Sequence, residues 1–241
     1  MKVTLTIDGQ IIHVEQHTPI LDAAKKLGIH IPTLCHHGAL KPFGSCRLCI
    51  VEVIRNKRSK LVTSCNYPAE NGLEVFTASD RVKRIRRMVV ELLLARCPNV
   101  LLIQELANEM GVKTARFKKK DDQRCILCGL CVRACEQIVG VSAIGFVNRG
   151  IEREVNTPFG IESHACIGCG TCTYICPTGC IEMVAKTDAP GGLCLKMGDL
   201  AMDPCPNSYH CDTCEIEHEF FQEMKRVIAD VRSNTPPTTF R

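Results

Sequence analysis

The sequence predicts an α+β protein with four consecutive parts, each marked by its own residue pattern. Residues 1–78 alternate apolar and polar side chains around turn signals, which is typical of strands. Residues 79–122 repeat apolar side chains every three or four positions, which indicates helices. Residues 123–188 hold two tight cysteine runs, and residues 189–241 hold four more cysteines before a second helical pattern. The cysteine runs are the strongest indication of what the chain does.

The first part opens with a predicted hairpin and a helix. Two alternating runs meet at Asp8-Gly9, a dipeptide that favours a tight turn between antiparallel strands. A helix is then expected with Thr18 as its N-terminal cap, Pro19 at its first position and residues 20–27 as its body. We therefore predict a small β-rich domain that carries one helix.

Four cysteines of this part are spaced C-x10-C-x2-C-x15-C, and they are Cys35, Cys46, Cys49 and Cys65. Gly44 and Ser45 precede the central pair, and their small size lets backbone amides approach the ligands of a cluster. Strands, a helix and then this loop resemble the β-grasp layout of plant-type [2Fe–2S] ferredoxins, although the first gap is six residues longer. The alternative is a four-cysteine zinc site. His36 and His37 are interpreted as loop residues rather than ligands.

Two helices are predicted in the second part, over residues 79–96 and 100–110, and Ser79 or Asp80 can cap the first. The apolar face of the first helix is expected to contain Val82, Ile85, Val89, Leu92 and Leu93. A basic stripe on the same helix contains Arg81, Lys83, Arg84, Arg86 and Arg87. This stripe is either a solvated face or a docking surface for an acidic partner subunit.

The third part contains two runs with the spacing C-x2-C-x2-C-x3-C. The runs are Cys125, Cys128, Cys131 and Cys135, then Cys166, Cys169, Cys172 and Cys176. Two such thiolate tetrads are the bacterial-ferredoxin arrangement for two [4Fe–4S] clusters, in which each fourth cysteine ligates the other cluster. One cluster is therefore assigned to Cys125, Cys128, Cys131 and Cys176, and the other to Cys166, Cys169, Cys172 and Cys135. Cys180 is expected to pack rather than bind metal.

The fourth part adds a C-terminal four-cysteine group made of Cys194, Cys205, Cys211 and Cys214. Four thiolates this close in sequence indicate a metal site. We favour a closed structural zinc site, with a further iron–sulfur cluster as the alternative, and His210 or His218 could replace one cysteine. A terminal helix is expected over residues 215–231.

Composition favours a reduced, cytoplasmic metalloprotein over a secreted disulfide scaffold. The 18 cysteines fall into repeated CxxC groups, and the N-terminal residues show no apolar signal region. No apolar run reaches the roughly 20 residues that a membrane-spanning helix needs. The formal charge of +4 treats cysteines as neutral, and each cluster with its four thiolates adds about −2, so three clusters give about −2. Nucleic-acid binding is therefore not favoured.

The order of modules over about residues 1–185 resembles the N-terminal iron–sulfur module of the complex I large subunit. It also resembles the corresponding parts of iron-only hydrogenases, formate dehydrogenases, NAD-linked hydrogenase diaphorase subunits and electron-bifurcating oxidoreductases. In complex I the connector supplies one histidine and three cysteines to an additional cluster. Here it offers only Cys97, so we predict that this cluster is absent and that Cys97 is a buried small hydrophobe.

The resemblance implies a subunit that relays single electrons and carries one [2Fe–2S] and two [4Fe–4S] clusters. Its expected partners are a flavoprotein that binds NAD(P)H and, at the other end, a low-potential acceptor such as ferredoxin or a further catalytic subunit. The sequence contains no G-x-G-x-x-G after a strand and no P-loop, so no catalytic residue is assigned. We expect a non-catalytic subunit of a hetero-oligomer, without direct membrane insertion.

Two alternatives stay open. Iron–sulfur subunits of succinate dehydrogenase and fumarate reductase also join a [2Fe–2S] domain to a ferredoxin-like unit. They normally use one cysteine run for a [3Fe–4S] centre, whereas both runs here keep four cysteines. The second alternative is a zinc-rich interaction protein. The sequence does not distinguish NAD from NADP or give the direction of electron flow.

Overall fold

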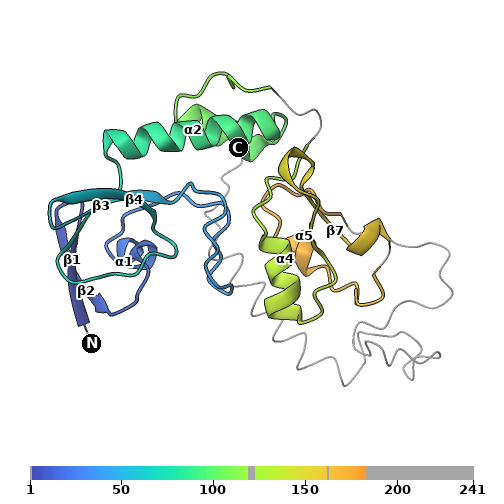
Figure 1. Cartoon of the computed structure of the whole chain (residues 1–241), viewed down its shortest axis with the longest axis horizontal. Helices are drawn as coiled ribbons and strands as arrows, with labels where there is room; N and C mark the ends of the chain where they lie inside the picture. Colours follow the sequence, from blue (N-terminus) through green and yellow to red (C-terminus); the bar gives the residue numbers. More distant parts are fainter. Residues whose placement is uncertain (1, 119–122, 162, 183–241) are drawn as a thin grey trace. The chain divides into compact units, whose positions relative to one another are not determined.

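The computed structural model describes residues 2–118, 123–161 and 163–182, which divide into two units (Figure 1). The described part of unit 1 comprises residues 2–36, 42–118 and 123–128. The described part of unit 2 comprises residues 37–41, 129–161 and 163–182. The C-terminal four-cysteine group and the predicted helix over residues 215–231 lie outside the described residues.

Unit 1 is built on a five-stranded mixed sheet with the strand order β2-β1-β5-β3-β4. Its strands are β1 (Lys2–Ile7), β2 (Gln10–Glu15), β3 (Ile50–Arg55), β4 (Arg58–Thr63) and β5 (Leu73–Phe76). Strand β1 runs parallel to β5, and the other neighbouring strands are antiparallel. Asp8 and Gly9 both have positive φ between β1 and β2, which confirms the predicted hairpin.

The core of unit 1 lies between this sheet and helix α1 (Ile20–Lys26). Alternate side chains of the strands enter it, and Ile7, Val51 and Val53 are completely buried. Ile20 and Ala23 of α1 are equally buried in the same cluster. Sheet and helix therefore form one compact layer pair that can hold the loops between its elements.

The start of α1 corrects one prediction. Pro19, not Thr18, occupies the N-terminal cap position, and no side chain caps the helix there. The Thr18 hydroxyl instead donates a hydrogen bond to the Glu15 carbonyl at 2.7 Å. That bond closes the turn after β2, while the Ile20 and Leu21 N–H groups at the start of the helix donate to the Tyr67 and Ser64 carbonyls.

Helix α2 (Asp80–Arg96) and helix α3 (Leu101–Glu109) also belong to unit 1. Ser79 caps α2, since its hydroxyl accepts the Val82 N–H at 3.3 Å as predicted. Helix α2 packs against β3 and α3. Gly111, with φ +69°, directly follows Met110, the C-terminal cap of α3.

The buried face of α2 differs from the predicted apolar face. Val82 is buried as expected, but Leu92 is 48% exposed, whereas Arg86 and Glu91 are buried. Hydrophobic periodicity could not reveal these two positions, because each charged side chain is buried with polar partners of its own. Arg86 donates to backbone carbonyls, and Glu91 accepts from Arg116. Arg86 therefore does not belong to a solvated or docking stripe.

Glu91 ties the chain that follows α3 back onto α2. Its carboxylate accepts the Arg116 backbone N–H at 2.7 Å and two guanidinium N–H groups at 2.7 and 2.8 Å. The hydrogen bonds from the Arg116 side chain hold the pKa of Glu91 below its usual range. The carboxylate thus stays ionised and continues to hold this segment at neutral pH.

Unit 2 consists of short elements. They are α4 (Leu130–Ala134), a π-helical turn (Cys135–Val139), β6 (Gly145–Val147), β7 (Glu154–Asn156) and α5 (Thr171–Tyr174). Strands β6 and β7 pair antiparallel, with Phe146 opposite Val155. Helices α4 and α5 lie against each other (Figure 1). The elements of both units confirm the α+β class, and none of the helices in the described ranges has the length and apolarity to cross a membrane.

Replacing Ser79 with alanine should loosen the first turn of α2. The variant removes the acceptor of the Val82 N–H, a change that typically costs about 1 kcal/mol. Hydrogen exchange at the first-turn amides should therefore rise about fivefold. Ser79→Thr keeps the hydroxyl and is the matched control. Wild-type protection in Ser79→Ala would show that this cap does not stabilise the helix.

Candidate metal centres

Hairpin pairing brings two of the predicted [2Fe–2S] cysteines together in unit 1. Cys49 directly precedes β3, Cys65 follows β4 closely, and Ile50 pairs with Thr63 at the open end of this hairpin. Cys35 lies in the loop after α1, and Cys46 begins the turn that leads to Cys49. Cys35, Cys49 and Cys65 are buried, and Cys46 is partly exposed.

The four thiols are grouped as two hydrogen-bonded pairs, Cys35 with Cys46 and Cys49 with Cys65. The hydrogen bond from Cys35 lowers the pKa of Cys46 to about 6, and the one from Cys65 lowers the pKa of Cys49 to about 7. The pKa values of Cys35 and Cys65 are raised, first because each thiol donates to its partner and then because each is buried. In each pair the hydrogen bond therefore favours the thiolate of one member, Cys46 or Cys49, and the thiolate is the form that binds metal.

Backbone geometry fits an anionic group beside these thiols. The Cys46 N–H donates to the Cys35 sulfur at 3.4 Å. Gly44 and Arg47, on either side of that segment, have φ of +69° and +59°. A Cβ at position 44 would lie 3.1 Å from the Asn66 side chain, so both the backbone angle and the space favour glycine there. Among the described residues, no three His, Cys, Asp or Glu side chains converge on a single metal ion.

The two later cysteine runs share the same backbone conformation at equivalent positions. Leu127 and Gly129 have φ of +54° and +72° in the first run. Gly168 and Gly170, at the same places in the second run, have φ of +66° and +71°. Left-handed residues of this kind turn neighbouring N–H groups inward and form concave sites for anions. Both loops are therefore suited to a sulfide-rich cluster with thiolate ligands.

The predicted [4Fe–4S] cysteines differ in their exposure. Cys125 and Cys128 belong to unit 1, and the other six belong to unit 2. In unit 2, Cys131 lies on α4 and Cys135 begins the π-helical turn, and both are buried. The Cys135 sulfur accepts the Ala143 N–H at 3.2 Å. Cys166 is exposed, while Cys169, Cys172 and Cys176 are half-buried, and Cys172 lies on α5.

Two cysteines outside the predicted ligand sets have defined places. Cys97 ends α2 and is completely buried, as predicted. Cys180 is half-buried, and its N–H and sulfur each lie 3.4 Å from the Cys176 sulfur. The contact with the Cys180 thiol is the main cause that raises the pKa of Cys176 to about 12. Cys180 thus touches a predicted ligand, which its sequence position alone did not indicate.

Part of the long first gap between Cys35 and Cys46 belongs to unit 2. This segment is His37–Lys41, and His36 and His37 lie in loop as predicted. The Lys41 N–H donates to Gln137 at 3.0 Å, and the Lys41 carbonyl accepts from Arg133 at 2.7 Å. Neither Arg133 nor Gln137 belongs to a recognisable motif, so the sequence alone does not indicate these two contacts. Their roles become visible only from their hydrogen bonds to Lys41 in the folded chain.

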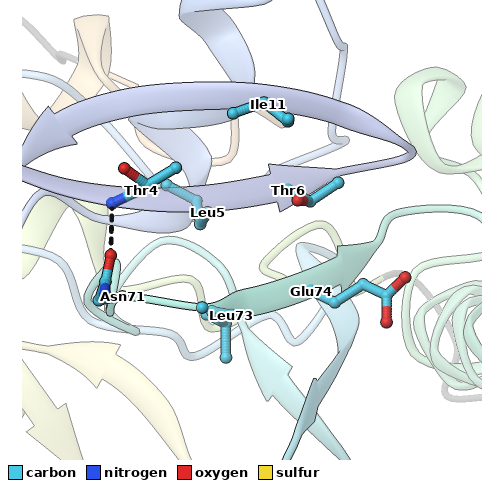
Figure 2. Close-up of a pocket in the computed structure, with 8 residues that line it drawn as sticks. Thr4, Leu5, Thr6, Ile11, Asn71, Leu73 and Glu74 are labelled. Carbon is cyan, nitrogen blue, oxygen red and sulfur yellow. Dashed lines mark hydrogen bonds between the residues drawn. The ribbon is translucent and has the colours of Figure 1, made fainter.

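Unit 1 has a surface pocket between β1 and β5 (Figure 2). Thr4 and Thr6 of β1 and Leu73 and Glu74 of β5 line it. Asn71 accepts the Thr4 N–H at 3.1 Å at one end (Figure 2). The lining contains no cysteine and no histidine, so it offers no soft metal ligand.

Replacing Gln137 with alanine should release the Lys41 amide. The variant removes the acceptor of that N–H, and a hydrogen bond of this kind contributes about 1 kcal/mol. Hydrogen exchange at Lys41 should rise about fivefold. Glu136→Ala, at the exposed neighbouring position, is the control and should leave this exchange rate unchanged. Equal rates in both variants would contradict the assigned role of Gln137.

Two family models match the chain in the regions that hold these cysteines. The model of a 2Fe-2S iron-sulfur cluster binding domain matches residues 1–80. The model of a 4Fe-4S dicluster domain matches residues 119–183. The matches cover the first cysteine set and both later runs, and they leave the C-terminal group outside.

Similar proteins are subunits of oxidoreductases. The NADPH-Fe(3+) oxidoreductase subunit alpha of Geobacter sulfurreducens is 37% identical over 201 residues, which is 73% of this chain and 24% of that protein. The mitochondrial NADH-ubiquinone oxidoreductase 78 kDa subunit of Candida albicans is 30% identical, over 75% of this chain and 28% of that protein. The NADP-reducing hydrogenase subunit HndD of Solidesulfovibrio fructosivorans is 34% identical, over 74% of this chain and 36% of that protein. The chain therefore spans about a quarter to a third of these relatives.

A solved structure supports the same relationship. A chain of the NAD+-reducing [NiFe]-hydrogenase in its H2-reduced state is 34% identical to this chain, with a TM-score of 0.57. The match covers 64% of this chain and 74% of that one. Sequence and fold thus agree on the relationship.

Proposed function

We propose that this chain, which belongs to the family of iron–sulfur proteins with a 2Fe-2S domain followed by a 4Fe-4S dicluster domain, relays single electrons between partner proteins. The carrying observation is the grouping of Cys35, Cys46, Cys49 and Cys65 into two thiol pairs within the 2Fe-2S match. Relatives named for NADH, NADPH, NADP or NAD+ chemistry support an NAD(P)-linked complex as the setting.

The ligand assignment follows from pairing and spacing. In unit 1, each iron of a [2Fe–2S] cluster would be held by one thiol pair, Cys35 with Cys46 or Cys49 with Cys65. One [4Fe–4S] cluster would be held by Cys125, Cys128, Cys131 and Cys176, and the other by Cys166, Cys169, Cys172 and Cys135. Each bound cluster would supply one-electron redox chemistry.

The protein's own residues shape the sites in two ways. Burial of Cys35, Cys49 and Cys65 excludes water from the first site. Backbone N–H groups that point at sulfur, from Cys46 in unit 1 and Ala143 in unit 2, stabilise negative charge on the ligands. Both exclusion of water and N–H donation are known to set cluster potentials, so these residues adjust the potential rather than perform bond chemistry.

The partners follow from the number of electrons in each step. A nicotinamide transfers a hydride, which carries two electrons, whereas these clusters transfer one electron at a time. A flavoprotein that binds NAD(P)H can divide the pair, and an electron-bifurcating complex is one setting in which this occurs. Ferredoxin or another catalytic subunit would take the electrons at the other end. A cytoplasmic location fits ligands that must stay reduced.

The remaining assignments complete the proposal. We propose domains at residues 1–78, 79–122, 123–188 and 189–241, with the last one organised by a metal. Cys194, Cys205, Cys211 and Cys214 would hold zinc, with a further iron–sulfur cluster as the alternative. Metal analysis of the purified full chain distinguishes the two.

Iron content and EPR test the cluster assignment. Anaerobically purified full chain should contain about ten irons, or about fourteen if the C-terminal group holds a further [4Fe–4S] cluster. Cys65→Ala should lower the intensity of the [2Fe–2S] EPR signal per chain by at least about tenfold, because one iron loses a ligand. Cys97→Ala also replaces a buried cysteine of unit 1, and it should keep the signal. Fewer than about six irons after reconstitution, or a native [3Fe–4S] signal, would contradict the assignment.

Reduction by nicotinamides tests the relay. The isolated full chain mixed anaerobically with NADH or NADPH should keep its clusters oxidised, because the flavin that accepts the hydride is proposed to lie in a partner. Adding the flavoprotein recovered with it in a gentle anaerobic pull-down should bleach the cluster absorbance. Direct reduction of the isolated chain by NADH or NADPH would sink the proposal that this chemistry belongs to a partner.

A further inference from the structure

Arg86 is a buried cation beside a cysteine of the [2Fe–2S] site. It projects from α2, which packs against β3, and only 9% of it is exposed. Its guanidinium donates to the Leu48 carbonyl at 3.1 Å and the Ile50 carbonyl at 2.7 Å. These two residues flank Cys49. A buried charge is costly unless it is well bonded, so the position of Arg86 needs a physical reason.

The acceptors of Arg86 are neutral, so its positive charge is not cancelled by them. Burial lowers the pKa of Arg86, while negative charge on Cys49 and Asp8 works in the opposite direction. A guanidinium keeps its proton in proteins even so. Arg86 therefore places a fixed positive charge within electrostatic reach of Cys49.

The carbonyls of three successive residues, Leu48, Cys49 and Ile50, all accept hydrogen bonds. Arg86 binds those of Leu48 and Ile50, and Ser64 binds that of Cys49 through its N–H at 3.1 Å and its hydroxyl at 2.8 Å. Because all three carbonyls accept hydrogen bonds from fixed donors, the backbone that carries Cys49 has one preferred conformation. Leu48, between Cys46 and Cys49, is completely buried and packs the same turn.

We propose that Arg86 is a positioning residue that fixes Cys49 and raises the reduction potential of the [2Fe–2S] cluster. This inference rests on the proposed function. Reduction adds one negative charge to the cluster, and a nearby positive charge in a low-dielectric environment favours that state. The Arg86 guanidinium donates to the backbone on both sides of Cys49, so its effect is exerted through the position of Cys49 and through its electric field.

Charge and hydrogen bonding can be separated by two substitutions. Arg86→Gln removes the charge and keeps a donor, whereas Arg86→Lys keeps the charge and loses the two-pronged geometry. Arg84→Gln removes the same charge from an exposed position on the same helix and is the control, because solvent and salt screen it. The readout is the potential of the [2Fe–2S] EPR signal in an anaerobic redox titration of the full chain.

Arg86→Gln should lower the equilibrium constant for reduction about tenfold, which corresponds to about 59 mV for one electron. The equilibrium constant for reduction of Arg86→Lys should stay within about threefold of the wild-type value, and that of Arg84→Gln should equal it. If Arg86→Gln fails to hold the cluster, Arg86→Lys with a bound cluster at wild-type potential still supports the role of the charge.

Three results would overturn the inference. The first is a reduction potential of Arg86→Gln equal to that of Arg84→Gln. The second is a potential of Arg86→Lys as low as that of Arg86→Gln. The third is loss of the cluster in both Arg86 variants, which is the outcome of a purely structural role. Absence of a [2Fe–2S] signal in reconstituted wild type would contradict the proposed function itself. A normal wild-type signal with unshifted variants would contradict only the role of Arg86.

Discussion

The antiparallel pairing of β3 with β4 is the constraint on which the first candidate centre depends. Register between Ile50 and Thr63 brings Cys49 and Cys65 together, although 15 residues separate them in the sequence. Contacts around these two cysteines stabilise their positions. Ser64 and Arg86 hold the backbone around Cys49, and the core beneath it is closed by Val51 and Val53. The sheet therefore supports the site directly, and the site requires a well-ordered hairpin.

The later runs rely on a different constraint, which is local backbone conformation. Each run needs two left-handed residues at fixed positions, and glycine supplies three of the four. Leu127 is the exception, and a side chain in this conformation costs about 1–2 kcal/mol relative to the usual region. Such strain is retained where the surroundings enforce it, and it is common at functional sites. Local geometry thus explains why these loops need so little secondary structure.

Sequence reasoning succeeded where the signal was local and failed where it depended on a distant partner. The Asp8-Gly9 turn, the Ser79 cap and the buried Cys97 were predictable from neighbouring residues. The turn between β3 and β4 was less visible, because Asn56 and Lys57 adopt positive φ without glycine. The burial of charged residues was not predictable in this way, since Arg86 and Glu91 are buried with hydrogen-bond partners 25 to 38 residues away in the sequence.

The candidate site followed the same rule. Spacing alone indicated which cysteines belong together, because ligand spacing reflects the shape of a cluster. It could not indicate the residues that support them, such as Arg86, Arg133 and Gln137, whose roles depend on tertiary contacts. The contact between Cys180 and Cys176 was likewise invisible, because a side-chain distance is needed to see it.

The central claim is that this chain stores and passes electrons singly through three clusters. An anaerobic reductive titration of the reconstituted full chain, followed by absorbance and EPR, tests it most directly. We predict uptake of about three electrons per chain in one-electron steps, or about four if the C-terminal group holds a cluster. A chain that carries its full metal content but takes up no electrons would contradict the account.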